Sequence, residues 1–548
     1  MQADSRKIIS ENIVADRSKL KIICVFLHRI YFGRIPYERQ YRGKKRKAMN
    51  ITELQQSYAS HPNVEGVCRL LKDNSVRHLY CGGLYASAAS LFSSVLVQRA
   101  TCPLVFILGD MEEAGYFYHD LTQILGTEQV LFFPSSFRRA IKYGQKDAAN
   151  EILRTEVLSR LQKGEEGLCV VTYPDALAEK VVSRKELGDN TLKLHAGERV
   201  DMNFVTDVLR SYGFEYVDYV YEPGQYAVRG SIIDVFSFSS EYPFRIDFFG
   251  DEVESVRTFE VETQLSKEKK ESIVIVPDLS HSLEKKGSGG MVSFLDFLPS
   301  DSLLAMRDFL WLRERIQTVH DESLTLQAIA ARESEENGAI TLEGKLIDGG
   351  EFTLRALDFR RMEFGNKPTG TPDATVSFHT TVQPIFHKNF DMVAESFREY
   401  LSRHYTIYIC SDSLKQTDRI RAIFEDRGDN ISFTAVERTL HEGFADDTLR
   451  ICVFTDHQLF DRFHKYNLKS DKARSGKVAL SLKELNQFTP GDYVVHTDHG
   501  VGRFAGLVRI PNGDTTQEVM KIVYQNEDVV FVSIHSLHKV SKYKGKEG

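Results

Sequence analysis

A glycine turn between two regular elements is the first stretch of this 548-residue sequence that could do chemistry. The strand expected at Val76–Cys81 is followed by Gly83–Ser90 (GLYASAAS) and an Ala/Ser-rich helix. A strand, a glycine turn and a helix N-terminus can bind phosphate through backbone N–H groups. A P-loop has the pattern GxxxxGK[ST], but here Ala89 stands in the lysine position, and Ala86 and Ala88 replace two glycines. We therefore expect a nucleotide-binding fold that binds no nucleotide, with Ser90 closing the degenerate loop.

Histidines are the second group of residues that could do chemistry. His457 and His464 lie seven residues apart, a spacing that could place both on one helical face. Nothing near them supplies further metal ligands, so we expect a structural or solvent-facing role. His496, Asp498 and His499 resemble a metal or acid–base cluster, but the two glycines that follow favour a tight turn. The sequence thus predicts no catalytic residue and no metal site.

Composition indicates a reduced protein without a membrane span. The seven cysteines are scattered and never form CxxC, which favours free thiols in a cytoplasmic protein. The longest apolar run, 22–27, is far too short to cross a membrane. We therefore expect a cytoplasmic protein with no membrane partner.

The net charge of −7 is unevenly distributed. Residues 1–48 contain 13 Lys and Arg and 4 Asp and Glu, so they carry +9 and the other 500 residues carry −16. The acidic remainder is unlike a DNA-coating surface. The run Lys44–Lys47 could bind nucleic acid or be a solvated tail. An amphipathic pattern begins at Met49, so we expect residues 1–48 to be a basic extension upstream of the natural start.

Elements of α/β type must position the glycine turn. Residues 49–145 alternate helical and strand patterns, including a helix at Met111–Leu125, as is typical of a parallel sheet. Residues 146–212 are expected to form a separate small α/β unit. Lys180 and Arg184 lie near the end of one of its helices, where they could complement the helix C-terminus or bind a partner. Residues 213–345 are expected to return to the first domain. Trp311, on a helix of this segment, is expected to be a core residue and not a ligand platform.

A β-meander occupies residues 221–259 within that return. Phe244, Ile246 and Phe248 alternate with more polar positions, the two-residue period of a half-buried strand. Asp234 in the preceding strand could face Arg245 or lie beside Asp247, which would place a charged cluster on one face of the meander.

Two further units complete the expected architecture. Residues 370–470 form a second small α/β domain. Residues 480–548 read as short strands separated by Gly and Asn-Gly turns, which favours an SH3-like barrel. The expected fold is therefore a multidomain α/β protein that ends in a small β-barrel.

Two stretches carry a family resemblance. The meander, GQYAVRGSIIDVFSFSSEYPFRIDFFGDEVES, resembles the module shared by the excision-repair helicase subunit UvrB and the transcription-repair coupling factors (the Mfd family). The terminal PGDYVVHTDHGVGRFAGL resembles the RNA-polymerase-interacting domain of the same family, which is related to CarD-type regulators. UvrB has the first stretch without the second. The order of the two therefore identifies the sequence as a relative of the coupling factors, with a UvrB-like domain at 49–145 that has lost its P-loop.

The resemblance implies two protein partners. The damage-recognition protein UvrA would bind the inserted unit at 146–212, with Lys180 and Arg184 as candidate contacts. The β subunit of RNA polymerase would add to an edge strand of the terminal CarD-like barrel. The candidate edge is the segment Leu507, Val508, Arg509 and Ile510, whose apolar members could equally be barrel core.

The resemblance also implies what this chain does not do. Full-length members of the family are DNA translocases that use ATP and Mg²⁺, and their motor domains follow the barrel. This sequence stops about where that connection begins, so we expect no cofactor and no enzyme activity in this chain, and DNA contact mainly through the motor domains. The expected function is an adaptor between stalled polymerase and excision repair. The alternatives are a CarD-like transcription regulator and a UvrB-like ATP-dependent helicase.

Overall fold

The computed structural model describes residues 48–136, 148–261, 263–278, 290–333, 344–464, 466, 489–496, 499–512, 515–525, 528–533 and 540–542. The run Lys44–Lys47 and nearly all of the expected extension lie outside these residues. The chain divides between Ala48 and Met49, and the fold described here belongs to the unit Met49–Gly548.

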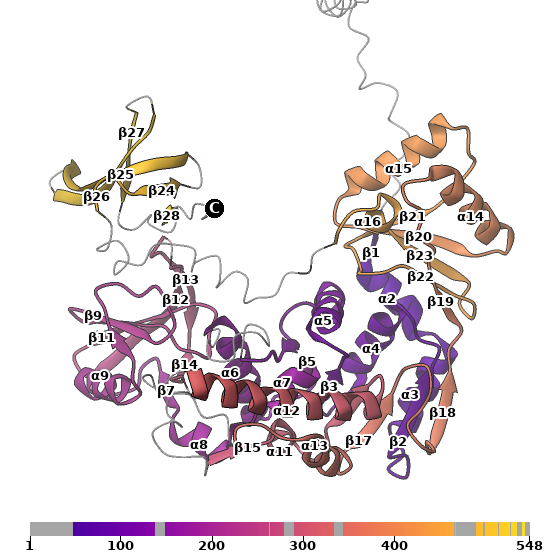
Figure 1. The fold of residues 1–548 in the computed structure, drawn as a ribbon, viewed down its shortest axis with the longest axis horizontal. Coiled ribbons are helices and arrows are strands. Elements are labelled where there is room, and N and C mark those ends of the chain that lie inside the picture. The colour runs from indigo at the N-terminus through magenta and orange to yellow at the C-terminus, as the bar shows by residue number, and fades with distance from the viewer. Residues whose placement is uncertain are drawn as a thin grey trace, which may run out of the picture. The chain divides into compact units, whose positions relative to one another are not determined.

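A seven-stranded parallel sheet, called the first sheet, belongs to this unit (Figure 1). Four of its strands, β3, β4, β5 and β16, are fully buried, mainly apolar runs, as expected for a parallel sheet that helices cover on both faces. The strand order is β18 (Ala374–Ser377), β2 (His78–Gly82), β17 (Arg360–Glu363), β16 (Leu303–Met306), β3 (Leu104–Ile107), β5 (Cys169–Thr172) and β4 (Val130–Phe132). The parallel α/β domain expected from the sequence is therefore present.

Helices of the first-sheet region have local start and stop signals. The Asp110 carboxylate accepts the backbone N–H of Glu113 at the start of α5 (Met111–Leu125), and Gly126 at its end has φ +83°. The sequence predicts the same bounds for this helix. The other helices are α2 (Ile51–Ala59), α3 (Pro62–Leu70), α4 (Ala88–Arg99), α6 (Ala148–Lys163), α7 (Pro174–Ala178), α8 (Arg184–Asp189), α11 (Phe294–Phe297), α12 (Phe309–Glu333) and α13 (Gly349–Ala356).

An inserted module, residues 192–275, interrupts the first sheet. It opens with β7 (Leu192–His195) and closes with β14 (Ser272–Ile275), which pair antiparallel. Between them, α9 (Met202–Ser211) packs on a six-stranded sheet through a separate apolar core. The sheet order is β13 (Ser266–Lys270), β12 (Glu252–Phe259), β11 (Phe244–Phe249), β10 (Ile232–Val235), β9 (Gln225–Arg229) and β8 (Glu215–Tyr216).

The module's bounds differ from the separate unit expected at 146–212. β5 lies inside the first sheet, between β3 and β4, so the chain from α6 to β5 belongs to that sheet. The short strand β6 (Val181–Val182) pairs with β15 (Met291–Val292), also outside the module. Local α/β alternation cannot show which sheet a strand joins, and that is why the meander and the inserted unit were expected to be separate.

A six-stranded second sheet follows. Its order is β1 (Met49–Asn50), β21 (Thr434–Glu437), β20 (Thr406–Ser411), β23 (Ile451–Thr455), β22 (Phe444–Asp446) and β19 (Thr380–Val382). The helices here are α14 (Phe390–Ser402), α15 (Leu414–Asp426) and α16 (Asp456–Leu459). Two strands cross the expected boundaries: β1 belongs to this sheet, whereas β18 belongs to the first.

One apolar core joins the first and second sheets. Val436, Phe444 and Val453 of the second sheet belong to the same buried cluster as the strands of the first. Tyr58 on α2 is fully buried, and its hydroxyl donates to the Asp446 carboxylate at 3.0 Å. The two sheets therefore form one packed body.

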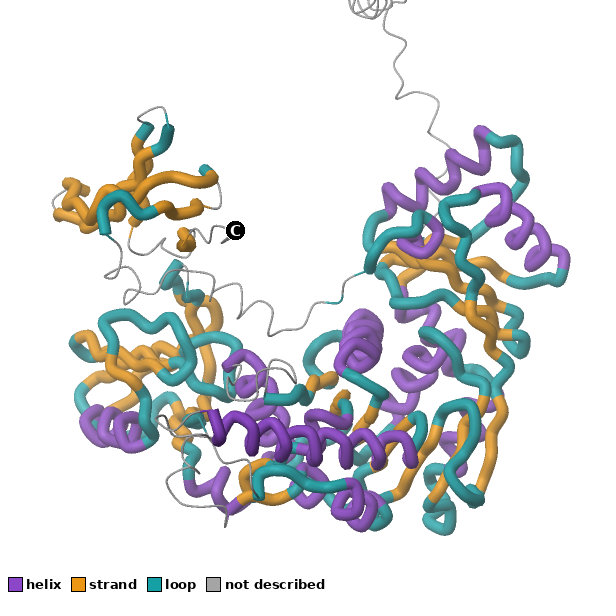
Figure 2. Tube along the Cα trace, viewed as in Figure 1, coloured by secondary structure: helices purple, strands orange, loops and turns teal. Residues whose placement is uncertain are grey.

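The terminal sheet is antiparallel and all-β in its described residues (Figure 2). Its order is β27 (Val529–Ser533), β26 (Thr515–Val523), β25 (Gly500–Asn512), β24 (Tyr493–His496) and β28 (Val540–Lys542). A small core that includes Phe504 and Met520 fills one face. The all-β character is confirmed, while closure into an SH3-like barrel stays a prediction. No helix in the described parts of the chain is long and apolar enough to cross a membrane.

Candidate functional sites

The degenerate loop lies at the carboxyl end of β2, where a phosphate-binding turn would lie. Gly83 has φ +77°, and a Cβ there would come within 2.1 Å of the Phe378 carbonyl oxygen. Ser87 precedes α4, and its hydroxyl donates to the Asp120 carboxylate at 2.6 Å. The Ser87 hydroxyl also accepts the backbone N–H of Glu442 at 3.0 Å. Groups of the protein itself therefore occupy the start of α4.

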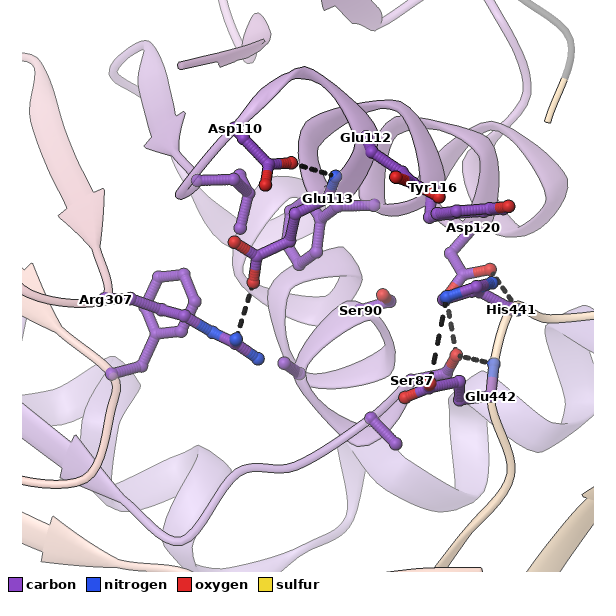
Figure 3. Close-up of a pocket in the computed structure, with 15 residues that line it drawn as sticks. Ser87, Ser90, Asp110, Glu112, Glu113, Tyr116, Asp120, Arg307, His441 and Glu442 are labelled. Carbon is purple, nitrogen blue, oxygen red and sulfur yellow. Dashed lines mark hydrogen bonds and ion pairs between the residues drawn. The ribbon is translucent and has the colours of Figure 1, made fainter. Parts of the chain in front are cut away.

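Asp120 supplies an anion beside this loop (Figure 3). Its side chain is buried and also accepts the backbone N–H of His441 at 2.7 Å. Burial raises the pKa of Asp120 to about 6, and the bonds from Ser87 and His441 oppose that rise. A carboxylate of the chain thus already accepts hydrogen bonds at this loop.

A cavity of about 390 Å³ opens beside the loop. Carboxylates dominate its charged lining: Asp110, Glu112, Glu113, Asp120 and Glu442. Arg307 is the cation of the lining, and it pairs with Glu113 at 2.6 Å (Figure 3). This charge balance repels a polyphosphate, whereas a P-loop attracts one with a lysine.

Trp311 does not lie in the core. The apolar face of α12 is formed by Phe309, Leu312 and Ile316, which are buried at helical spacing. Trp311 falls off that face, and 47% of its surface is exposed. The expectation of a buried Trp311 was therefore wrong.

Lys180 and Arg184 lie outside the inserted module. The Arg184 guanidinium donates to the Phe297 carbonyl oxygen at 2.6 Å and lies 4.7 Å from the centre of the Phe297 ring. Partial burial lowers its pKa. The backbone N–H of Lys180 donates to the backbone carbonyl oxygen of Lys345 at 2.8 Å. Arg184 thus has an intramolecular role, and its expected contact with UvrA stays a prediction.

The charged cluster of the meander is centred on Asp234. This fully buried carboxylate lies opposite Arg245 in the β10–β11 register and accepts two of its N–H groups at 2.8 and 2.9 Å. Those hydrogen bonds raise the pKa of Arg245. Arg229 binds the same carboxylate from β9, while Asp247 pairs with Arg257. Of the two arrangements left open by the sequence, the structure has Asp234 facing Arg245.

Exposed aromatic side chains distinguish the surface of the inserted module. Phe248 is buried, so the next residue of β11, Phe249, points to the other face and is 80% exposed at the Gly250 turn. Tyr216 and Phe204 are also more than half exposed. The sequence contained this signal, since consecutive phenylalanines in a strand cannot share one face.

The candidate polymerase-binding edge lies in the second half of β25. From Leu507 to Asn512 this strand pairs with β26, and its pairing with β24 covers only Gly500–Arg503. Among the described residues, the other edge of β25 is therefore uncovered beyond Phe504. Leu507 is 37% exposed and Val508 partly buried. The side chains of Arg509 and Ile510 lie outside the description.

The expected histidine pairs have different outcomes. α16 ends at Leu459, so His457 and His464 do not share a helical face, although their rings stack at 4.3 Å. The ring centres of His496 and His499 are 4.7 Å apart, and Asp498 is outside the described residues. In the part of the chain that is described, no group of three or more His, Cys, Asp or Glu side chains is arranged to hold a metal ion.

The inserted module and the terminal sheet each match a family of known proteins. Residues 192–281 match the family model of the UvrB interaction domain, which covers the inserted module. Residues 488–544 match the CarD-like/TRCF RID domain, which covers the terminal sheet. The chain is similar to transcription-repair-coupling factors over most of its length. The resemblance expected from the sequence is therefore confirmed.

Two of these relatives illustrate the extent of the similarity. The transcription-repair-coupling factor of Bacillus subtilis (strain 168) is 22% identical over 544 residues, with 85% of this chain and 45% of the relative covered. That of Staphylococcus aureus (strain bovine RF122 / ET3-1) is 23% identical over 529 residues with the same coverage. The chain thus spans about half the length of the curated relatives it matches.

Proposed function

We propose that this chain is an adaptor that links RNA polymerase to UvrA in transcription-coupled excision repair. The observation that carries the proposal is the presence of two interaction domains in one chain: a UvrB interaction domain at 192–281 and a CarD-like/TRCF RID domain at 488–544. Binding of UvrA, binding of polymerase and recruitment of one by the other are each part of this proposal.

The surface around Phe249 is the proposed contact for UvrA. Exposed aromatic side chains on a rigid strand supply contact area at low entropic cost, and aromatic and arginine side chains dominate binding energy at interfaces. Phe249 lies at the end of β11, on the same strand as Arg245, whose geometry Asp234 fixes. Lys180 and Arg184 remain secondary candidates outside this module.

A pull-down with purified UvrA tests this contact. Phe249→Ala is expected to weaken binding by roughly tenfold or more, because a hot-spot aromatic contributes about 2 kcal/mol. Phe463→Ala is the matched control, since Phe463 is 83% exposed but lies far along the chain from the module. Equal binding by both variants would remove Phe249 from the interface, and failure of the unaltered chain to bind UvrA would overturn the repair half of the proposal.

The uncovered edge of β25 is the proposed contact for the polymerase β subunit. Strand addition uses main-chain hydrogen bonds for affinity and neighbouring side chains for specificity. Leu507→Arg places a charge beside this edge and is expected to abolish capture of the β subunit. Val501→Arg is the control, because Val501 is 48% exposed on the same strand where β24 pairs with it. Equal loss in both variants would indicate damage to the sheet instead of a contact at the edge.

We further propose that this chain does not bind ATP. Ala89 in place of the lysine, the Asp120 carboxylate at the loop and the acidic cavity lining support this proposal. In a calorimetric titration of the chain with ATP and Mg²⁺, we expect no saturable heat of binding. Tight binding would instead favour a UvrB-like helicase. A chain that captures polymerase but not UvrA would favour a CarD-like regulator.

A further inference from the structure

Four histidines meet where the first sheet packs on the second. His119 lies on α5, His441 follows β21, His457 lies on α16 and His464 follows α16. The ring centres of His119 and His464 are 5.2 Å apart, and those of His441 and His464 are 6.2 Å apart. His457 stacks on His464 at 4.3 Å. Segments more than 300 residues apart thus place four imidazoles in one cluster, in which His119 and His457 are buried and His441 and His464 are half-buried.

The cluster is built for neutral rings. His119 Nε2, His441 Nδ1 and His464 Nε2 are buried, and each is without a hydrogen-bond partner among the described residues. Burial and the neighbouring imidazoles lower the pKa of His119 and of His441 to about 4. Burial also lowers the pKa values of His457 and His464. Each added proton would place a positive charge beside other imidazoles and away from water.

The aromatic and backbone contacts of the cluster join the two sheets directly. Tyr116 on α5 stacks on His441 at 3.5 Å, and its hydroxyl donates to the His464 carbonyl oxygen at 2.8 Å. His457 Nε2 is 2.8 Å from the His441 carbonyl oxygen. A change in the charge of the rings therefore acts on the contact itself.

Acidic groups around the cluster only partly offset its added charge. The charged and titratable groups that face it are Glu112, Tyr116 and Asp120 on α5, Glu442 beside His441, Cys410 and Asp412 at the end of β20, and Asp456 and Arg462 around α16. Asp412 raises the pKa values of His119 and His464 against the effect of burial. Asp120 becomes neutral near pH 6, so its negative charge is lost before the histidines gain protons.

We propose that this cluster is a proton-operated latch between the first and second sheets. Neutral histidines hold α5 against the 439–442 loop and α16, and proton uptake opens this local contact while the apolar core shared by the two sheets stays packed. A histidine released to water gains its proton near pH 6.5, whereas the closed state resists it, so opening becomes easier as pH falls from about 6.5 toward 4. Asp120 acts in the opposite direction between about pH 6 and 4, because it binds a proton more readily when closed. Asp456, whose pKa burial also raises, acts in the same direction as Asp120. Four histidines outweigh these two carboxyls.

Hydrogen exchange on the full chain tests the latch. Exchange at about pH 7.5 and about pH 5, corrected for intrinsic rates, is expected to show protection falling by roughly tenfold or more for α5, residues 439–442 and α16 at the lower pH. Protection in β20 and β3 should change much less. Unchanged protection at the three latch segments, or equal loss throughout both sheets, would overturn the proposal.

Paired variants separate titration from general acid sensitivity. The double variant His119→Phe/His464→Phe keeps aromatic rings and loses no hydrogen bond of the unpartnered Nε2 atoms. It is expected to lose most of the acid-induced opening. His404→Asn is the matched control, because His404 is exposed and asparagine tolerates its φ of +63°, and this variant should open as the unaltered chain does. An unaltered acid response in the double variant would exclude the two rings as proton acceptors. If that variant does not fold, the exchange profile of the unaltered chain still decides the proposal.

Discussion

Asp234 organises the inserted module because its carboxylate is fully buried and binds two arginines from neighbouring strands. A buried charge is tolerated only when hydrogen-bonded partners compensate it. Arg229 and Arg245 are partly exposed, so the cluster lies between the core of the module and its surface. The same three residues therefore stabilise the sheet and fix arginines next to the proposed UvrA contact.

Asp234→Asn is expected to destabilise the module by roughly 3 kcal/mol, because it leaves two arginines without their charge partner. Hydrogen exchange of β10 and β11 measures this change locally. Asp207→Asn is the control, because Asp207 pairs with Arg210 in the same module with about 70% of each side chain exposed. This second change should cost less than about 1 kcal/mol. Similar losses in both variants would contradict the role given to burial.

At the scale of elements, the loop between β2 and α4 is held by contacts with the protein itself. The backbone of Gly83 is in the left-handed region and touches Phe378, and Ser87 binds Asp120 and the Glu442 backbone. The loop therefore connects the first sheet with the second.

Gly83→Ala is expected to cost roughly 3 kcal/mol, because it adds left-handed strain and a collision with the Phe378 carbonyl oxygen. Gly126→Ala shares the positive φ but has nothing within 4 Å of the added Cβ, so about 1 kcal/mol is expected. Thermal unfolding of the two variants in parallel measures the difference. A Gly126→Ala loss as large as that of Gly83→Ala would show that strain alone, without the close approach, determines the cost.

Single elements were predictable from sequence where their signals are local. The Asp110 cap and Gly126 define α5, and the alternation in β11 identifies Phe244, Ile246 and Phe248 as core. The exposure of Trp311 was missed, because a lone tryptophan does not show which face of its helix is buried. The bounds of the inserted module were missed because only the pairing of β7 with β14 reveals them.

At the scale of the whole molecule, the shared core predicts how the chain unfolds. The first and second sheets belong to one apolar cluster, whereas the inserted module has a separate core. Phe444 is fully buried in the shared cluster and packs edge-to-face on Tyr58.

Phe444→Ala is therefore expected to remove about 3–5 kcal/mol and to reduce exchange protection in both sheets together. Phe248→Ala, in the core of the inserted module, should reduce protection within that module alone. The same exchange experiment measures both variants. Loss confined to the second sheet in Phe444→Ala would show that the two sheets open separately.

Contacts between segments that are distant in the chain could not be predicted from the sequence. Four histidines converge from α5, the 439–442 loop, α16 and the segment after α16, yet the sequence indicates only the 457–464 spacing. The pairing of β1 with β21 involves two residues, Met49 and Asn50, and so short a strand has no periodicity to detect. The candidate sites were predictable as modules, because their strands carry long patterns, but the individual contacts depend on tertiary packing.

The pairing of β1 with β21 also has a consequence during synthesis, because β1 is made long before its partner strand. Met49 leaves the ribosome nearly 400 residues before its partner Val436. At about 5–20 residues per second, this interval is roughly 20–80 s. Throughout it, the apolar side of α2, including Tyr58, has no completed second sheet to pack on. The nascent chain must therefore keep α2 soluble until translation passes β23, and a pause before that point would prolong the exposure of this helix to chaperones and proteases.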